Sequence, residues 1–120
     1  MTTVSVVIPT HNRARVLPRA IDSVLAQHRA PEDIILVDDG STDDTANLIA
    51  AYRATHPHIR AITLPVNRGA PLARNAGAEA ASGTLVAFLD SDDAWHPQKL
   101  ARQVALLEQT PDSPAAFTGF

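Results

Sequence analysis

Three aspartates within four positions follow an apolar run in the second half of the chain. The stretch VAFLDSDDAWHP, residues 86–97, carries Asp90, Asp92 and Asp93 at the end of that run. Two carboxylates about 5 Å apart repel by roughly 3 kcal/mol at an effective dielectric constant near 20, so solvation, nearby donors or a bound cation must offset the repulsion. Carboxylate oxygens suit Mg²⁺ or Mn²⁺, held by one or two carboxylates plus ligand phosphates. The alternative is a solvated acidic turn that caps the next helix, but a cap needs only one of the three.

A second acidic stretch, VDDGSTDDT, covers residues 37–45. Asp38 and Asp39 close an apolar run, and a carboxylate at that position could accept a hydrogen bond from a base N–H or a ribose hydroxyl. Gly40 permits a positive φ angle after the run. Asp43 and Asp44 suit the start of a helix, where negative charge is favourable. We therefore interpret Asp39 as a ligand contact and the last two aspartates as a helix start.

Arginine supplies nine of the ten basic residues, and Lys99 is the tenth. This bias suits bidentate contacts to phosphate or carboxylate, or it reflects a GC-rich genome. Arg68 and Arg74 lie in NRGAPLARNAG, residues 67–77, where each is either a solvated surface side chain or an anion clamp. The small residues Ala73 and Gly77 of this stretch predict close packing of a helix on a sheet.

The histidines and the single tryptophan give weaker signals. His11 follows the first apolar run and could line a site, whereas His96 is interpreted as a helix cap. Trp95 is interpreted as structural, covering the floor of the site. His56 and His58 are typical of a solvated turn.

Composition sets bounds on the class of protein. The chain has 120 residues, 45% of them hydrophobic, which is enough for one domain with a real core. A net charge of −3 argues against nucleic acid as the main partner. The absence of cysteine excludes disulfides and thiolate metal sites. No signal peptide or membrane span is recognisable in the sequence, so a cytoplasmic location is expected.

Apolar runs and amphipathic stretches alternate along the chain. Strands are expected over residues 4–9, 34–37, 59–65, 84–90 and 114–120, with helices over 15–27, 45–56, 70–82 and 98–109. Ser41 or Thr42 is expected to cap the helix that follows, with Ser41 and Asp44 at capping-box spacing. Pro18 and Pro97 are expected in the first turns of their helices. The alternation predicts an α/β fold with three layers and a mostly parallel sheet. Ligands bind such sheets beyond the carboxyl ends of the strands, where both acidic stretches fall.

Four motifs in order together resemble the family 2 glycosyltransferases with the GT-A fold. They are VSVVIPTHNR, ILVDDGSTDDT, NRGAPLARNAGAEAASG and FLDSDDAWHPQKL, and they extend over nearly all of the chain. The resemblance implies one donor-binding domain over residues 1–120, forming the N-terminal part of a longer, here truncated, GT-A enzyme. It also implies a nucleotide-diphosphate sugar donor, with a UDP-sugar favoured, and Mn²⁺ or Mg²⁺.

The resemblance carries roles onto matching positions. Nucleotide-sugar contacts fall on the residues after the expected strands and on the two arginines: Pro9, Thr10, His11, Asp38, Asp39, Arg68, Arg74, Asp90, Ser91 and Asp92. It implies that Asp92 and Asp93 reach the cation. The resemblance implies transfer of the sugar, with inversion, to a hydroxyl of a saccharide or lipid-linked acceptor. The base that deprotonates this hydroxyl is expected beyond residue 120.

Other parallel α/β proteins fit the sequence less well. A dinucleotide-binding domain needs a glycine-rich turn after the first strand, where this chain has PTHNRARV. A phospho-acceptor receiver would want a lysine after its last strand, whereas Lys99 falls in a predicted helix. The glycine-rich, arginine-bearing opening loop of sugar nucleotidyltransferases is absent. The open alternative is a non-catalytic nucleotide-binding fragment that lacks the acceptor half. Its uncovered sheet edge would favour self-association.

Overall fold

The computed structural model describes residues 2–109, over which four strands and four helices alternate. Their bounds are β1 Val4–Thr10, α1 Leu17–Leu25, β2 Asp33–Asp39, α2 Thr45–Thr55, β3 Ile59–Leu64, α3 Ala70–Ala80, β4 Leu85–Phe88 and α4 Lys99–Gln109. The predicted alternation is confirmed over this range. The fifth strand, expected over residues 114–120, lies outside the described residues.

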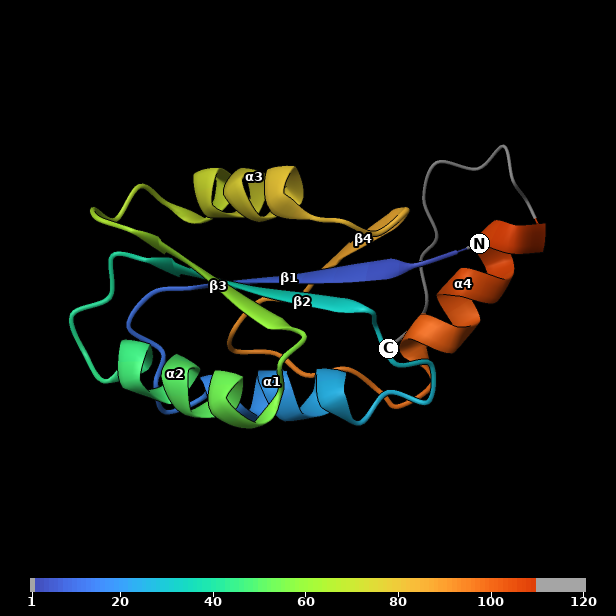
Figure 1. The fold of residues 1–120 in the computed structure, drawn as a ribbon, viewed down its shortest axis with the longest axis horizontal. Coiled ribbons are helices and arrows are strands. Elements are labelled where there is room, and N and C mark those ends of the chain that lie inside the picture. Colours follow the sequence, from blue (N-terminus) through green and yellow to red (C-terminus); the bar gives the residue numbers. More distant parts are fainter. Residues whose placement is uncertain (1, 110–120) are drawn as a thin grey trace.

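All four strands run parallel in one sheet of order β3-β2-β1-β4. The chain adds β2 and β3 on one side of β1 and then crosses to the other side for β4 (Figure 1). Strand order therefore reverses between β1 and β4. In parallel α/β sheets this is where the loops that follow neighbouring strands part and leave a crevice.

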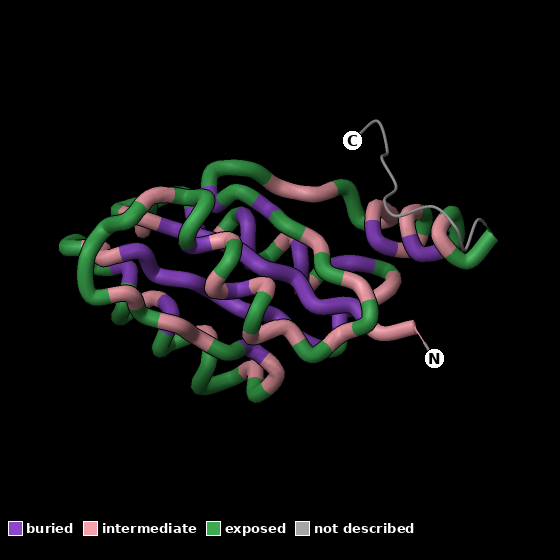
Figure 2. Tube along the Cα trace, turned by 90° about the horizontal axis from the view of Figure 1, so that it is seen from above, coloured by how far each residue is buried: buried purple, intermediate pink, exposed green. Residues whose placement is uncertain are grey.

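Helices cover both faces of the sheet, as the sequence predicts. In Figure 1, α3 lies over one face, and α1 and α2 lie over the other. Every residue of β1 and β2 is buried, and Figure 2 shows these central strands as the buried interior of the molecule. Alternate residues of β1 serve the two faces: Ile8 packs in the cluster that contains Ile21 of α1, and Val7 packs in the cluster that contains Ala73 of α3.

Helix α3 lies close to the sheet because its inner face carries small residues. A Cβ added at Gly77 would overlap the side chain of Val7, and Ala73 is fully buried. Any larger side chain at Gly77 would force the helix away from β1. The predicted close packing is confirmed.

Two predicted helix starts are wrong in detail. Ser41 does not cap α2: Thr45 begins the helix, and its N–H donates to Asp43 Oδ1 at 3.0 Å. The Ser41 hydroxyl instead accepts from the N–H of Asn12 at 2.9 Å. Pro97 lies in the turn before α4, which begins at Lys99. By contrast, Pro18 occupies the first turn of α1 as expected.

Trp95 also differs from its prediction. It packs against the core cluster between the sheet and α1, with Lys99 Nζ 5.2 Å from the ring centroid. It is structural, but it does not line the pocket described below.

A buried carboxylate ties the strands together at the amino end of the sheet. Asp33, the first residue of β2, accepts from Arg60 Nε at 2.9 Å and Arg60 Nη2 at 2.8 Å. It also accepts from the hydroxyls of Ser5 at 2.8 Å and Ser82 at 3.1 Å. Burial alone would raise the pKa of Asp33, but these donors outweigh it and lower the pKa to about 2. Asp33 is thus a closed, fully bonded centre that joins β1, β2, β3 and the segment before β4.

The far edge of the sheet is open over the described residues. Strand β4 pairs only with β1, and Val86 and Phe88 are 39% and 45% exposed. Because Phe88 is in register with Val7, it lies on the same side of the sheet as α3, which packs mainly over β1 and β2. Self-association through this edge stays a prediction.

Candidate active site

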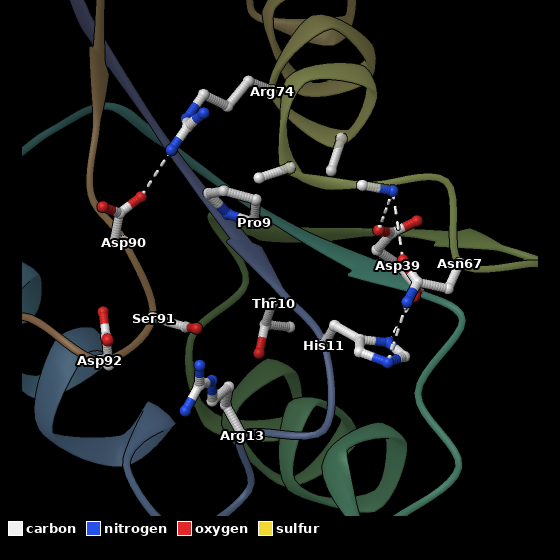
Figure 3. Close-up of a pocket in the computed structure, with 13 residues that line it drawn as sticks. Pro9, Thr10, His11, Arg13, Asp39, Asn67, Arg74, Asp90, Ser91 and Asp92 are labelled. Carbon is white, nitrogen blue, oxygen red and sulfur yellow. Dashed lines mark hydrogen bonds and ion pairs between the residues drawn. The ribbon is translucent and has the colours of Figure 1, made fainter.

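A cavity of about 420 Å³ opens at the carboxyl ends of β1, β2 and β4 (Figure 3). Its thirteen lining residues are Pro9, Thr10, His11, Arg13, Asp39, Asn67, Gly69, Ala70, Ala73, Arg74, Asp90, Ser91 and Asp92. The cavity spans the reversal of strand order, with the loop after β1 on one side and the loop after β4 on the other. Both acidic stretches meet there, so the pocket lies at the strand ends where the sequence predicts a site.

Asp39 builds one wall of the pocket. Its carboxylate is buried, with the residue 3% exposed, and it accepts backbone hydrogen bonds from Arg68 at 2.9 Å and Gly69 at 2.8 Å. These bonds hold the loop before α3 against the end of β2. Gly40 allows the same approach, because its φ angle is +70° and a Cβ there would lie 2.6 Å from the Asn67 nitrogen.

His11 has a defined tautomer in this wall. Its Nδ1 lies 2.7 Å from the carbonyl oxygen of Asp39, so Nδ1 must carry the proton. Nε2 is then an acceptor, and it lies 3.1 Å from Nδ2 of Asn67, which donates to it. A neutral imidazole therefore bridges the loops that follow β1 and β3. It lies at the end of the pocket beside Asp39 (Figure 3).

The loops after β1 and β2 are also bonded to each other. Asn12, with a φ angle of 52°, accepts from the N–H groups of Thr42 at 2.8 Å and Asp43 at 3.2 Å. The N–H of Ala14 donates to Asp43 Oδ2 at 3.2 Å. Asparagine tolerates this left-handed conformation better than most residues. The interaction explains why Asp43 belongs to the helix start and not to the pocket.

The carboxylates after β4 differ in their surroundings. Asp90 pairs with Arg74 of α3 at 2.9 Å, and both side chains are partly exposed at 59% and 38%. An exposed pair of this kind contributes less than about 1 kcal/mol, so a ligand can displace it. Asp92 lines the pocket, and no hydrogen bond or ion pair within residues 2–109 uses its carboxylate. Asp93 lies outside the lining, and its Oδ1 accepts from the N–H of Ala94 at 2.8 Å.

One buried polar atom in the pocket is unsatisfied. Thr10 Oγ1 is the single buried side-chain nitrogen or oxygen of the described residues that lacks a hydrogen-bond partner, and Thr10 is 3% exposed. An unpaired buried hydroxyl destabilises a fold by about 1–3 kcal/mol. Such an atom is expected where a ligand supplies the missing partner.

Most of the predicted site residues come together in the pocket. Those that line it are Pro9, Thr10, His11, Asp39, Arg74, Asp90, Ser91 and Asp92. Asp38, Arg68 and Asp93 do not line it. Successive strand residues point to opposite faces of the sheet, so Asp38 points away from the face of Asp39. Asp38 is buried, at 3% exposure, and accepts from the N–H of Ser41 at 3.0 Å. Arg68 contributes its backbone N–H to Asp39, and its side chain is exposed.

The sequence reasoning missed five lining residues: Arg13, Asn67, Gly69, Ala70 and Ala73. Arg13 and Asn67 each stand in a quoted motif, but neither was assigned a role. Their signal is positional, since each lies in a loop directly beyond the carboxyl end of a strand.

The model of the glycosyl transferase family 2 matches residues 5–118, nearly the whole chain. The chain belongs to this family. Among curated relatives of the family 2 chain, an uncharacterized glycosyltransferase of Nostoc sp., alr2836, is 46% identical over 105 residues, or 88% of this chain and 33% of the relative. The putative teichuronic acid biosynthesis glycosyltransferase TuaG of Bacillus subtilis is 38% identical over 117 residues, or 98% of this chain and 46% of the relative. The chain thus spans between a third and a half of the length of these relatives.

Solved structures agree with this assignment and with the GT-A fold. TarS 1-349 of S. aureus, in complex with UDP-GlcNAc, superposes with a TM-score of 0.80 at 30% identity, over 89% of this chain and 31% of that one. The mannosyltransferase PcManGT from Pyrobaculum calidifontis, in complex with GDP-Man and Mn²⁺, superposes with a TM-score of 0.82 at 28% identity. The match covers 94% of this chain and 33% of that one. Within residues 2–109, no helix of the family 2 chain has the length and apolar character needed to cross a bilayer.

Proposed function

We propose that this chain forms the donor-binding part of a metal-dependent, inverting glycosyltransferase that uses a nucleotide-diphosphate sugar, with UDP-sugars favoured. The observation that carries the proposal is the pocket at the reversal of strand order. It brings Asp39, Asp90 and Asp92 together from two strand ends. Relatives of similar fold bind UDP-GlcNAc or GDP-Man with Mn²⁺, which supports a nucleotide-sugar ligand.

The two ends of the pocket differ in chemistry. At the end formed by Asp39, His11 and Asn67, a neutral imidazole and a buried carboxylate face a ligand. We place the nucleobase here, where the carboxylate of Asp39 has lone pairs left to accept its N–H groups. At the end formed by Asp90 and Asp92, exposed carboxylates face the pocket, and we place the ribose and diphosphate there.

The carboxylates after β4 fit a divalent cation. Asp92 is an unpaired, hard oxygen donor in the pocket, and Asp93 follows it directly. No group of three or more histidine or acidic residues that could hold a metal occurs within residues 2–109, so phosphate oxygens of the donor would complete the ligand set. A bound Mn²⁺ or Mg²⁺ would stabilise the negative charge that develops on the departing diphosphate. Asp92 and Asp93 remain our assignment for its ligands.

We assign the other parts of the reaction to regions that the longer relatives have and that this chain does not span. Inversion needs a base that deprotonates the acceptor hydroxyl, and we place it in the portion of the relatives that this chain does not span. TuaG is named for teichuronic acid biosynthesis, and this supports a saccharide or lipid-linked acceptor in cell-envelope polysaccharide synthesis. We propose a cytoplasmic location for the donor-binding part.

Calorimetry with UDP, GDP and ADP, each with Mn²⁺ and with a chelator, tests the proposal. We expect UDP to bind only with the metal, and the double variant Asp92→Asn/Asp93→Asn to lose at least about 100-fold in affinity, equivalent to about 2.7 kcal/mol. Asp44→Asn is the matched control, because Asp44 is an exposed helix-start carboxylate outside the pocket. Equal UDP affinity with and without the chelator would refute the metal role. No binding of any nucleotide would refute the proposed function itself.

A further inference from the structure

Arg13 is an uncompensated positive charge in the pocket. It lines the cavity and is exposed, and no acidic side chain of the described residues lies within ion-pair distance of it. The other basic residue of the lining, Arg74, is already paired with Asp90 at 2.9 Å. Of the two guanidinium groups, only that of Arg13 is therefore free for an anionic ligand.

The backbone holds Arg13 in a fixed place. Its carbonyl oxygen accepts the N–H groups of Val16 at 3.0 Å and Leu17 at 2.9 Å, which form the entry to α1. Asn12 before it and Ala14 after it are each bonded to the loop after β2. Because the backbone here is already held by hydrogen bonds, the guanidinium loses less conformational entropy on binding than one on a flexible loop.

Two hydroxyl groups project into the same part of the pocket. Figure 3 shows the side-chain oxygen of Thr10 pointing toward the region between Arg13 and Ser91. Thr10 Oγ1 is buried without a partner, and Ser91 is 7% exposed with no side-chain hydrogen bond to the described residues. A guanidinium and two hydroxyls form a set of donors that matches phosphoryl oxygens.

The charge of the lining supports the same ligand. Three carboxylates and two guanidinium groups leave it with one net negative charge when His11 is neutral. The carboxylates alone would repel a diphosphate. One divalent cation would change the net charge of the lining only from −1 to +1. Arg13 adds positive charge on the side of the pocket away from Arg74 (Figure 3).

We propose that Arg13, with the hydroxyls of Thr10 and Ser91, binds a phosphoryl oxygen of the donor's diphosphate, separately from the carboxylates that hold the cation. This inference rests on the proposed function and adds a subsite to it. Arg13 is a binding residue for the phosphates and makes no contact with the base in this arrangement. Its contribution should therefore grow with the number of phosphates in the ligand.

Calorimetry with uridine, UMP and UDP, in saturating Mn²⁺, measures that growth for each variant. We expect Arg13→Ala to lower UDP affinity roughly ten- to hundredfold and to change uridine affinity less than about twofold. Arg13→Lys should recover part of the loss, since lysine keeps the charge without the planar fork. Arg15→Ala is the matched control, because Arg15 is an exposed arginine two positions away that does not line the pocket.

Thr10→Val gives a second, independent readout. Valine has nearly the shape of threonine and removes the unpartnered buried hydroxyl, so the melting temperature should stay the same or rise. UDP affinity should fall by several-fold at the same time. A purely structural threonine would show the opposite, a lower melting temperature and unchanged UDP affinity.

The outcomes separate the two proposals. If the wild-type protein binds none of UDP, GDP and ADP, the proposed function fails and this inference with it. If it binds UDP and Arg13→Ala binds UDP equally well, the phosphate subsite is wrong while the proposed function stands. Equal losses for uridine and UDP, or an equal loss for Arg15→Ala, would also overturn the subsite.

Discussion

Strand β2 carries an aspartate at each end, and the two carboxylates have opposite surroundings. Asp33 at the amino end is enclosed by the side chains of Arg60, Ser5 and Ser82. Asp39 at the carboxyl end is held by two backbone N–H groups and still borders an open pocket. The residues around Asp33 satisfy one another, whereas the pocket beside Asp39 contains an unpaired hydroxyl, an unpaired carboxylate and an unpaired guanidinium among its described residues.

The comparison separates a structural cluster from a functional one in physical terms. Polar groups that only stabilise a fold are expected to find partners within it, because unsatisfied buried groups are unfavourable. Groups that await a ligand remain unsatisfied and are stabilised by other parts of the fold. By this criterion we expect a ligand at the carboxyl end of the sheet, although both ends hold a buried aspartate.

Removing Asp33 should give the largest effect and should act on stability alone. We expect Asp33→Ala to lower the free energy of unfolding by about 3 kcal/mol, because Arg60, Ser5 and Ser82 lose a common acceptor. Urea denaturation measures the loss, and Arg29→Ala is a control that removes the partly exposed Arg29–Glu32 pair for less than about 1 kcal/mol. A large change in the UDP affinity of the folded variant would contradict the claim that Asp33 acts on stability alone.

The pH dependence of the unfolding free energy should also reflect the ionisation of Asp33. The pKa of Asp33 is lowered from 3.8 to about 2, so its stabilisation is present above about pH 4 and is lost as the pH falls toward 2. That shift corresponds to about 2 kcal/mol. Urea denaturation at pH 5, 4, 3 and 2 should show this loss in the wild type, and Asp33→Asn should reduce it. An unchanged pH profile in the variant would assign the acid sensitivity elsewhere.

Asp39→Ala should give a smaller loss of stability together with a loss of binding. Removing this acceptor leaves the N–H of Arg68 to water and the N–H of Gly69 with only Asn67 Oδ1, at 3.1 Å. We therefore expect a loss of about 1–2 kcal/mol in unfolding free energy. UDP affinity should fall at least about tenfold, because the wall of the pocket moves and the proposed base contact is gone. Unfolding and calorimetry on the same preparation test both effects. A variant that loses stability but keeps its UDP affinity would make Asp39 structural, like Asp33.

The sequence predicted the elements, and the meeting of its two acidic stretches, for clear reasons. Continuous apolar runs and helical patterns reflect burial, so the four strands and four helices within residues 2–109 are recognisable from the sequence. The position of the acidic stretches followed from parallel topology, since all strands end on one side.

Tertiary contacts were not predictable in the same way. Ser41 looked like a helix cap, but its hydroxyl is taken by the N–H of Asn12, 29 positions away. Asp38 and Asp39 are adjacent in sequence, and only the register and the direction of the strand decide that Asp39 borders the pocket. Arg13 gave no signal beyond its position, because an unpaired side chain is recognised only when its surroundings are known.

The bonds among the loops at the carboxyl end have one further consequence. The segments around Asn12, Thr42 and Gly69 are linked to one another through side chains as well as through the sheet beneath them. Opening any one of them must therefore break contacts of its neighbours, and the rim of the pocket should fluctuate as a single cooperative unit. A ligand of this pocket would then meet a recess whose shape already exists, and its binding energy would go into recognition instead of assembling the walls.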